Sequence, residues 1–183
     1  ISLASASPII TVTTKPVYYP GQTVVVEGTA PPNVEVGITV YNPNNVVVYS
    51  TIVNSTSSGE YSAVLFTFPS EATSEFPYGT YTIKVGTSTG FTNETTFQFE
   101  PQMATVIVQV FNPQNLPVQG AKVIAVGTPY TAITNSTGEA VLMLPSGSYT
   151  IQVIPPSPYV PTEKTITVVA PQSYTCLLYT SPS

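Results

Sequence analysis

Histidine, arginine, aspartate and tryptophan are all missing from this chain of 183 residues, and cysteine occurs only once. Catalytic triads and Cys-His pairs need a histidine, so nucleophilic catalysis of those kinds is excluded. A zinc site would need histidines or several cysteines. Phosphates and nucleic acids bind to basic patches, which four lysines in a chain of net charge −5 do not supply. These absences predict a structural, extracellular protein that is not an enzyme and holds no metal or other cofactor.

Two further shortages concern the environment of the chain. With Cys176 alone, no disulfide can form within the chain, and we expect this thiol to be a small buried apolar group. No apolar run reaches 18 residues, so we expect no membrane-spanning segment. Because the chain begins at Ile1 rather than at a methionine, we expect a leader to have been removed. The shortage of charge fits either an acidic exterior or a surface covered by glycans.

Residues typical of β-strands dominate what remains. There are 28 threonines and 18 serines, and clusters of Pro, Gly, Asn and Ser recur about every 8 to 12 residues, the spacing found in β-sandwiches. Several segments alternate between apolar and polar residues, as half-buried strands do. The pattern predicts an all-β fold with strands at 9–14, 22–28, 35–41, 46–53, 60–66, 80–85, 94–99, 105–111, 121–126, 140–144, 148–154, 164–169 and 174–179. The one short helix candidate, at 70–76, is closed by Pro77.

A boundary between two domains is predicted at the sequence Glu100-Pro101-Gln102. Proline cannot donate a hydrogen bond to a sheet, so Pro101 fits a linker better than a central strand. We therefore expect an N-terminal extension at 1–8, a first sandwich at 9–100 and a second sandwich at 101–183.

Several motifs resemble those of known sandwich families. The segments KPVYYPGQ at 15–22, VVVEG at 24–28, SGEY at 58–61 and YGTYT at 78–82 resemble immunoglobulin-like domains of archaeal surface proteins and of macroglobulin-type repeats. In the second half, LPVQGAKV at 116–123, NSTGEA at 135–140 and LPSGSY at 144–149 resemble the carboxypeptidase-regulatory-like and pilin-type sandwich repeat. The resemblance covers most of residues 9–170. It implies two tandem immunoglobulin-like sandwiches, and such sandwiches have many roles.

Three Asn-x-Ser/Thr triplets predict N-linked glycans at Asn54, Asn93 and Asn135. With so many hydroxyl residues, one or two such triplets would also arise by chance. All three nevertheless lie at predicted strand ends or turns, where a bulky sugar fits. We expect glycans at these three positions and at none of the other six asparagines.

The glutamates offer no supported catalytic pair. Glu71 and Glu75 are four residues apart, and Glu94 and Glu100 flank one predicted strand. Neither pair has supporting residues nearby, so we interpret all four as solvated carboxylates.

In architecture and composition, the chain resembles the extracellular thread filaments of Sulfolobales-type archaea. That resemblance implies a homopolymer of identical subunits on the cell surface, joined head to tail when the N-terminal strand of one subunit inserts into the next, with other cells or surfaces as further partners. Apolar Ile1 and Leu3 alternate with small residues, so this segment suits insertion into an open sheet edge. The predicted joining strand consists of Ile1, Ser2, Leu3, Ala4, Ser5, Ala6 and Ser7.

The resemblance also implies a possible cross-link, because pilin-type sandwiches can carry Lys–Asn isopeptide bonds. Their formation needs a lysine buried in apolar surroundings, where burial lowers its pKa. The candidate donors are Lys15, Lys84, Lys122 and Lys164, with no acceptor assigned, and the alternative is four solvated lysines.

Two other functions stay open on the sequence alone. One is a monomeric adhesin or S-layer-associated module that binds a glycan or a partner protein. The other is an accessory domain of a larger secreted hydrolase. A polymer would run as a ladder on a gel, whereas a binding module would elute near 19.4 kDa plus its glycans.

Overall fold

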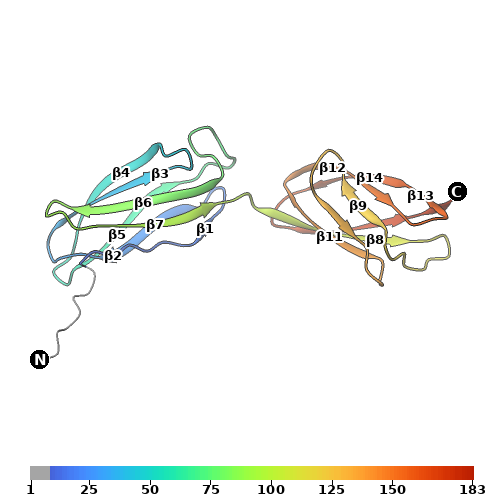
Figure 1. The fold of residues 1–183 in the computed structure, drawn as a ribbon, viewed down its shortest axis with the longest axis horizontal. Helices are drawn as coiled ribbons and strands as arrows, with labels where there is room; N and C mark the ends of the chain where they lie inside the picture. Colours follow the sequence, from blue (N-terminus) through green and yellow to red (C-terminus); the bar gives the residue numbers. More distant parts are fainter. Residues whose placement is uncertain (1–8) are drawn as a thin grey trace, which may run out of the picture. The chain divides into compact units, whose positions relative to one another are not determined.

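A computed structural model describes residues 9–183, and in this range the chain forms strands and loops without any helix (Figure 1). The chain divides between Pro101 and Gln102 into two compact units. No helix in the described range is therefore available to cross a membrane. The predicted all-β fold class is confirmed. The short helix candidate at 70–76 does not form a helix, because these residues form bends in a loop.

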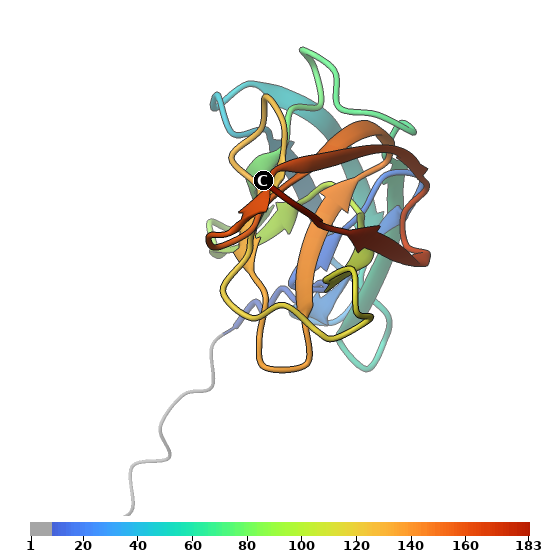
Figure 2. The ribbon, with the colours of Figure 1, turned by 90° about the vertical axis from the view of Figure 1, so that its right-hand side faces the viewer.

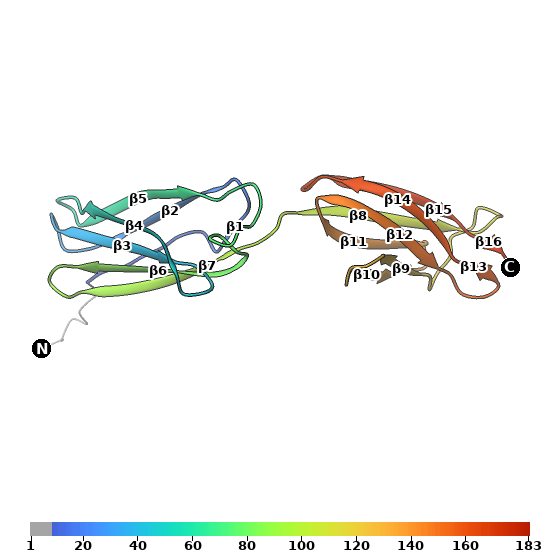
Figure 3. The same cartoon turned by 90° about the horizontal axis from the view of Figure 1, so that it is seen from above.

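The first unit is a sandwich of a five-stranded and a two-stranded sheet. The larger sheet has the order β1-β7-β6-β3-β4 and the smaller one pairs β2 with β5. Figure 3 shows β2 and β5 in the layer opposite β6 and β7. The strands are β1 (Val17–Tyr18), β2 (Thr23–Thr29), β3 (Glu35–Tyr41), β4 (Val47–Asn54), β5 (Glu60–Thr67), β6 (Gly79–Thr87) and β7 (Thr92–Phe99).

The second unit has a four-stranded sheet of order β10-β9-β12-β14 and a three-stranded sheet of order β11-β8-β15. A short pair, β13 with β16, lies next to the C-terminus, which faces the viewer in Figure 2. The strands are β8 (Met103–Phe111), β9 (Lys122–Ala125), β10 (Thr131–Ile133), β11 (Glu139–Pro145), β12 (Gly147–Ile154), β13 (Tyr159–Val160), β14 (Thr162–Val168), β15 (Ser173–Tyr179) and β16 (Ser181–Pro182).

Alternation in the sequence decides which side chains form the core. In β8, Ala104, Val106, Val108 and Val110 are buried while the residues between them are half-buried on the other face. Full burial of a valine side chain contributes about 1.5–3 kcal/mol relative to its exposure to water. Each unit has its own cluster of such residues, so each has a separate hydrophobic core.

The first predicted strand, at 9–14, is wrong as a continuous strand. Thr13 forms one isolated bridge with Glu27, and the N–H of Thr11 donates to the carbonyl of Thr29 at 2.8 Å. The chain then passes to the other sheet, where β1 pairs in parallel with β7. Pro16 precedes β1 and has no N–H to donate, so the pairing is interrupted at this crossing.

Candidate functional site

Two of the three predicted glycan acceptors lie at turns or strand ends, and all three are exposed. Asn54 ends β4, Asn93 is the second residue of β7, and Asn135 lies in the turn between β10 and β11. Their side chains differ in what they already bind. Glycosylation stays a prediction at each position.

Asn135 occupies a turn that the chain uses three times. At Asn42, Asn112 and Asn135, the residue's own N–H donates to the carbonyl four residues later, at 2.8–2.9 Å. In each case the side-chain oxygen accepts the N–H groups two and four residues later. The residue three positions later has a positive φ of 62° to 75°, a conformation suited to Asn or Gly. The turn therefore fixes the orientation of each asparagine side chain.

The amide nitrogens of these three asparagines are used differently. Asn42 Nδ2 donates to the carbonyl of Glu75 at 3.0 Å, and Asn112 Nδ2 lies 3.3 Å from the hydroxyl of Tyr159. Among residues 9–183, Asn135 Nδ2 has no such partner, while Thr137 Oγ1 donates to Asn135 Oδ1 at 2.7 Å. The structure thus leaves the nitrogen of Asn135 exposed and available to a sugar.

Asn93 is engaged in the fold itself. Its Nδ2 donates to the carbonyl of Ile10 at 2.9 Å, and its Oδ1 accepts the N–H of Glu94 at 2.8 Å. Ile10 is 3% exposed and belongs to the core of the first unit. Asn93 therefore ties the start of the described chain to β7.

We expect replacement of Asn93 with Asp to lower the free energy of unfolding by about 1–2 kcal/mol, because a carboxylate cannot donate to the Ile10 carbonyl. The matched control is Thr95→Val, which removes the same glycosylation triplet and leaves the Asn93 side chain in place. Urea denaturation of unglycosylated protein measures both. Equal losses in the two variants would contradict the role of Asn93.

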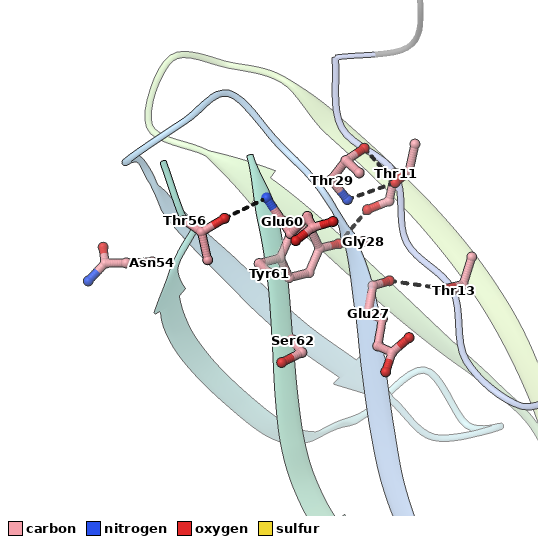
Figure 4. Close-up of a pocket in the computed structure, with 10 residues that line it drawn as sticks. All are labelled: Thr11, Thr13, Glu27, Gly28, Thr29, Asn54, Thr56, Glu60, Tyr61 and Ser62. Carbon is pink, nitrogen blue, oxygen red and sulfur yellow. Dashed lines mark hydrogen bonds between the residues drawn. The ribbon is translucent and has the colours of Figure 1, made fainter. Parts of the chain in front are cut away.

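A polar hollow of about 620 Å³ lies on the first unit between β2, β5 and the segment before β1 (Figure 4). Its floor includes Gly28 and the ring of Tyr61, whose hydroxyl donates to the carbonyl of Thr11. The carboxylates of Glu27 and Glu60 line it with several hydroxyls. Asn54 stands at its edge with the amide directed away (Figure 4).

The hollow brings together a pair of glutamates that the sequence did not predict. The register of β2 and β5, in which Thr29 pairs with Glu60, explains their proximity. Within the described chain, no group of three or more acidic or sulfur side chains could hold a metal ion. The tyrosine at its floor is buried and hydrogen bonded, so the hollow presents hydroxyls and carboxylates without an activated group.

Burial raises the pKa of Tyr61 from 10.0 to about 12 and raises the pKa of Tyr81 further. The folded first unit therefore keeps protons that the unfolded chain releases above about pH 10. We expect its stability to be fully present below pH 10 and to fall as the pH rises through about 12. Thermal unfolding at a series of pH values, followed by circular dichroism, measures this loss of stability. In the Tyr61→Phe variant we expect a smaller loss over the same pH range. A first unit whose unfolding temperature does not change between these pH values would contradict it.

Acid should have much less effect on stability. Eight of the nine glutamates are exposed and the ninth, Glu139, is half-buried. In the described part of the chain, the one ion pair joins Lys84 to Glu94 at 4.0 Å, and both side chains are more than half exposed. Such pairs contribute at most about 1 kcal/mol. We expect the unfolding temperature to change little between pH 7 and about pH 3, and a large drop over that range would contradict this.

All four lysines are exposed. Lys15 lies 5.5 Å from the ring centre of Tyr18, and Lys84 lies 5.1 Å from that of Tyr41. Lys122 begins β9 and Lys164 lies in β14. None has the buried, apolar surroundings on which the isopeptide prediction depends. The predicted joining strand, residues 1–7, lies outside the described residues.

Pairs of hydroxyl groups bridge neighbouring segments on the surface of both units. Thr11 bonds to Thr29 at 2.8 Å, Thr23 to Thr67 at 2.7 Å, and Ser148 to Thr167 at 2.9 Å, each pair across neighbouring segments. Cross-strand pairs of this kind stabilise a sheet by a few tenths of a kcal/mol up to about 1 kcal/mol each. They also give a polar surface to a protein with few charges.

Exposed apolar side chains gather on the outer face of one sheet of the second unit. On the three-stranded sheet, Val141, Met143, Leu177 and Tyr179 are 45–55% exposed. The ring of Phe111 lies 5.8 Å from that of Tyr179, which continues the apolar surface across β8. Glu139 at its border accepts a hydrogen bond from Gln109 at 2.9 Å. Gln109 and Thr175 lie among these side chains on the same face. Clusters of exposed apolar side chains are common at interaction sites.

The chain is similar to a curated surface protein. It is 56% identical over 169 residues to "S-layer protein B" of Metallosphaera sedula, a match covering 92% of this chain and 40% of that protein. The chain thus spans well under half the length of this relative. No family model matches the chain.

Solved structures show weaker likeness. The Bacillus anthracis TIE protein matches 97% of this chain and 41% of its own, with 15% identity and a TM-score of 0.41. BcpA, the major pilin subunit of Bacillus cereus, matches 95% of this chain and 71% of its own, with 11% identity and a TM-score of 0.40. Both TM-scores are below 0.5, so neither match supports an inference about function.

Proposed function

We propose that this chain is a structural, non-enzymatic part of a cell-surface layer and lies outside the cell. The observation that carries the proposal is the 56% identity to an S-layer protein over 92% of the chain. The sequence alone favoured a filament joined by strand insertion and kept an S-layer-associated module as the alternative. The relative supports the alternative better than the filament.

The surface chemistry of the described residues fits this role. The chain has two compact units with separate hydrophobic cores, and pairs of hydroxyls bridge neighbouring strands on the surface of each unit. N-linked glycans at Asn54, Asn93 and Asn135 would add further uncharged polar groups to this surface. A surface with few charges depends little on the pH and the salt outside the cell.

The apolar face of β11, β8 and β15 is the proposed contact with a neighbouring subunit of the layer. Four large apolar side chains are exposed on it, and the carboxylate of Glu139 on the same face is already hydrogen bonded. Contact there would remove exposed apolar surface from water, which stabilises an assembly by about 25 cal/mol per Å².

Replacing Leu177 with Glu tests that contact. Leu177 is 45% exposed, so we expect the variant to fold with unchanged stability but to leave the surface layer more readily during extraction. The control, Thr167→Glu, places the same charge on the hydroxyl-lined outer face of β14 and should leave extraction unchanged. If both variants and the unaltered protein are extracted equally readily, the apolar face is not the contact between subunits.

A further inference from the structure

The first and last long strands of the second unit lie side by side and run in the same direction. β8 follows directly after the boundary at Pro101, and β15 is the last long strand before the C-terminus. They pair in parallel at seven positions, from Ser173 with Thr105 to Tyr179 with Phe111. The chain therefore enters this ladder at one end and leaves it at the other, as Figure 1 shows for the second unit.

This arrangement determines what happens when the two ends of the unit are pulled apart. The pulling directions then lie along the two strands and opposite to each other, so all hydrogen bonds of the ladder carry the load together. When entry and exit lie at the same end of a pair, the bonds open one after another instead. A single hydrogen bond contributes little on its own. Many that must break together raise the barrier to unfolding, and this barrier governs forced unfolding.

The ladder is bonded at both of its ends and buried on one face. The N–H of Thr105 donates to the carbonyl of Gln172 at 3.1 Å, and the N–H of Thr180 donates to the carbonyl of Phe111 at 2.8 Å. Between them, Cys176 and Leu178 of β15 are at most 5% exposed and pack in the core. On its other side, β8 pairs with β11 at seven further positions. The pairing with β11 therefore holds β8 in the sheet when tension acts on it.

The first unit has a shorter version of the same pairing. β1 pairs in parallel with β7 at two positions, Val17 with Gln98 and Tyr18 with Phe99. Two further bonds flank them: Gln98 N–H to the Pro16 carbonyl at 2.9 Å and Glu100 N–H to the Tyr18 carbonyl at 3.0 Å. Fewer bonds share the load here.

We propose that the second unit is a load-bearing clamp, built to resist tension along the chain, and that the first unit yields at a lower force. The use of such a clamp under tension in a surface layer rests on the proposed function. The clamp itself does not, because it is a mechanical property of the isolated chain.

Single-molecule force spectroscopy on the full chain, pulled through its two ends, tests the proposal. We expect two unfolding events, with the event at higher force belonging to the second unit. The same chain is then pulled through its N-terminal end and a cysteine at Gln172→Cys, in a Cys176→Val background. In this geometry the force acts on the adjacent ends of β8 and β15, so their hydrogen bonds open one after another. We therefore expect the second unit to unfold at a several-fold lower force. Equal unfolding forces of the second unit in the two geometries would overturn the proposal. So would a second unit that unfolds at a lower force than the first when the chain is pulled through its two ends.

A pair of proline variants gives an independent check. Thr180→Pro removes the bond to the Phe111 carbonyl, whereas Thr175→Pro lies on the alternate set of β15 residues, whose N–H groups point to the free edge. We expect the first to lower the unfolding force of the second unit and the second to leave it near the original value. Urea denaturation of both variants separates a mechanical effect from a general loss of stability. The reverse order of forces at matched stability would contradict the clamp.

Discussion

Replacement of Phe68 with alanine is expected to lower the free energy of unfolding of the first unit by about 4 kcal/mol. Phe68 is 2% exposed and follows β5 in a loop. Its ring is stacked on that of Phe99, with 3.8 Å between the ring centres. It is nearly perpendicular to the rings of Phe66 and Tyr81, with 5.1 and 5.3 Å between the ring centres. Removing it leaves a cavity among aromatic rings that have no small neighbour able to fill it.

The matched control is Val64→Ala on β5, because Val64 is 69% exposed on the outer face. We expect that variant to change stability by less than about 0.5 kcal/mol. Urea denaturation followed by NMR amide signals reports the two units separately. A Phe68→Ala variant as stable as Val64→Ala would show that the aromatic cluster does not hold the first unit together.

The second large effect is expected at Gly28, where replacement with alanine should cost the first unit about 3 kcal/mol. A Cβ at this position would collide with the carbonyl oxygen of Thr11 and the hydroxyl of Tyr61. These two groups are hydrogen bonded to each other. The substitution would therefore separate the segment before β1 from β2 and open the floor of the polar hollow.

Gly37→Ala is the control for this change. Gly37 lies in β3, and a Cβ there would meet its nearest atom, the carbonyl oxygen of Gly86, at an ordinary contact distance of 3.6 Å. Alanine at an unstrained glycine site often stabilises by a few tenths to about 1 kcal/mol, because the unfolded chain loses freedom. Equal losses for the two variants, measured by the same denaturation, would rule out the proposed collision.

Local alternation explains why most strands could be predicted from the sequence. β8 alternates between buried and half-buried positions over its whole length, and its predicted and observed bounds differ by two residues at one end. The segment at 9–14 misled the prediction, because Ile10 and Val12 face the core while its backbone pairs with β2 at isolated positions only. Strands of two residues such as β1 carry no periodicity that a sequence could show.

Contacts distant in sequence could not be predicted. β11 is apolar on both faces, so its sequence does not say that Val141 and Met143 point outward while Leu142 and Leu144 enter the core. The parallel pairing of β8 with β15 joins residues far apart in the chain. Phe68 lies outside any strand pattern, although it is the centre of the aromatic cluster.

The candidate sites likewise include features that are local in the sequence and features that depend on contacts distant in the sequence. The glycosylation triplets are local, so the sequence identifies Asn54, Asn93 and Asn135 directly. The bond from Asn93 to the Ile10 carbonyl depends on how the sheets bring these residues together. The pairing of Glu27 and Glu60 at one hollow likewise depends on strand register. The exposure of the four lysines agrees with the solvated alternative given by the sequence, since a lysine is seldom fully buried.

The most direct test of the central claim is the position of this protein on the cells that make it. An epitope tag placed in the exposed turn after Asn112 would be located by gold labelling and electron microscopy of intact cells and of isolated surface layers. We expect the label on the outside of unbroken cells and, at the same density, in surface layers freed of membrane and cytoplasm. Label only on separate thin filaments, or only inside opened cells, would contradict a structural role in the surface layer.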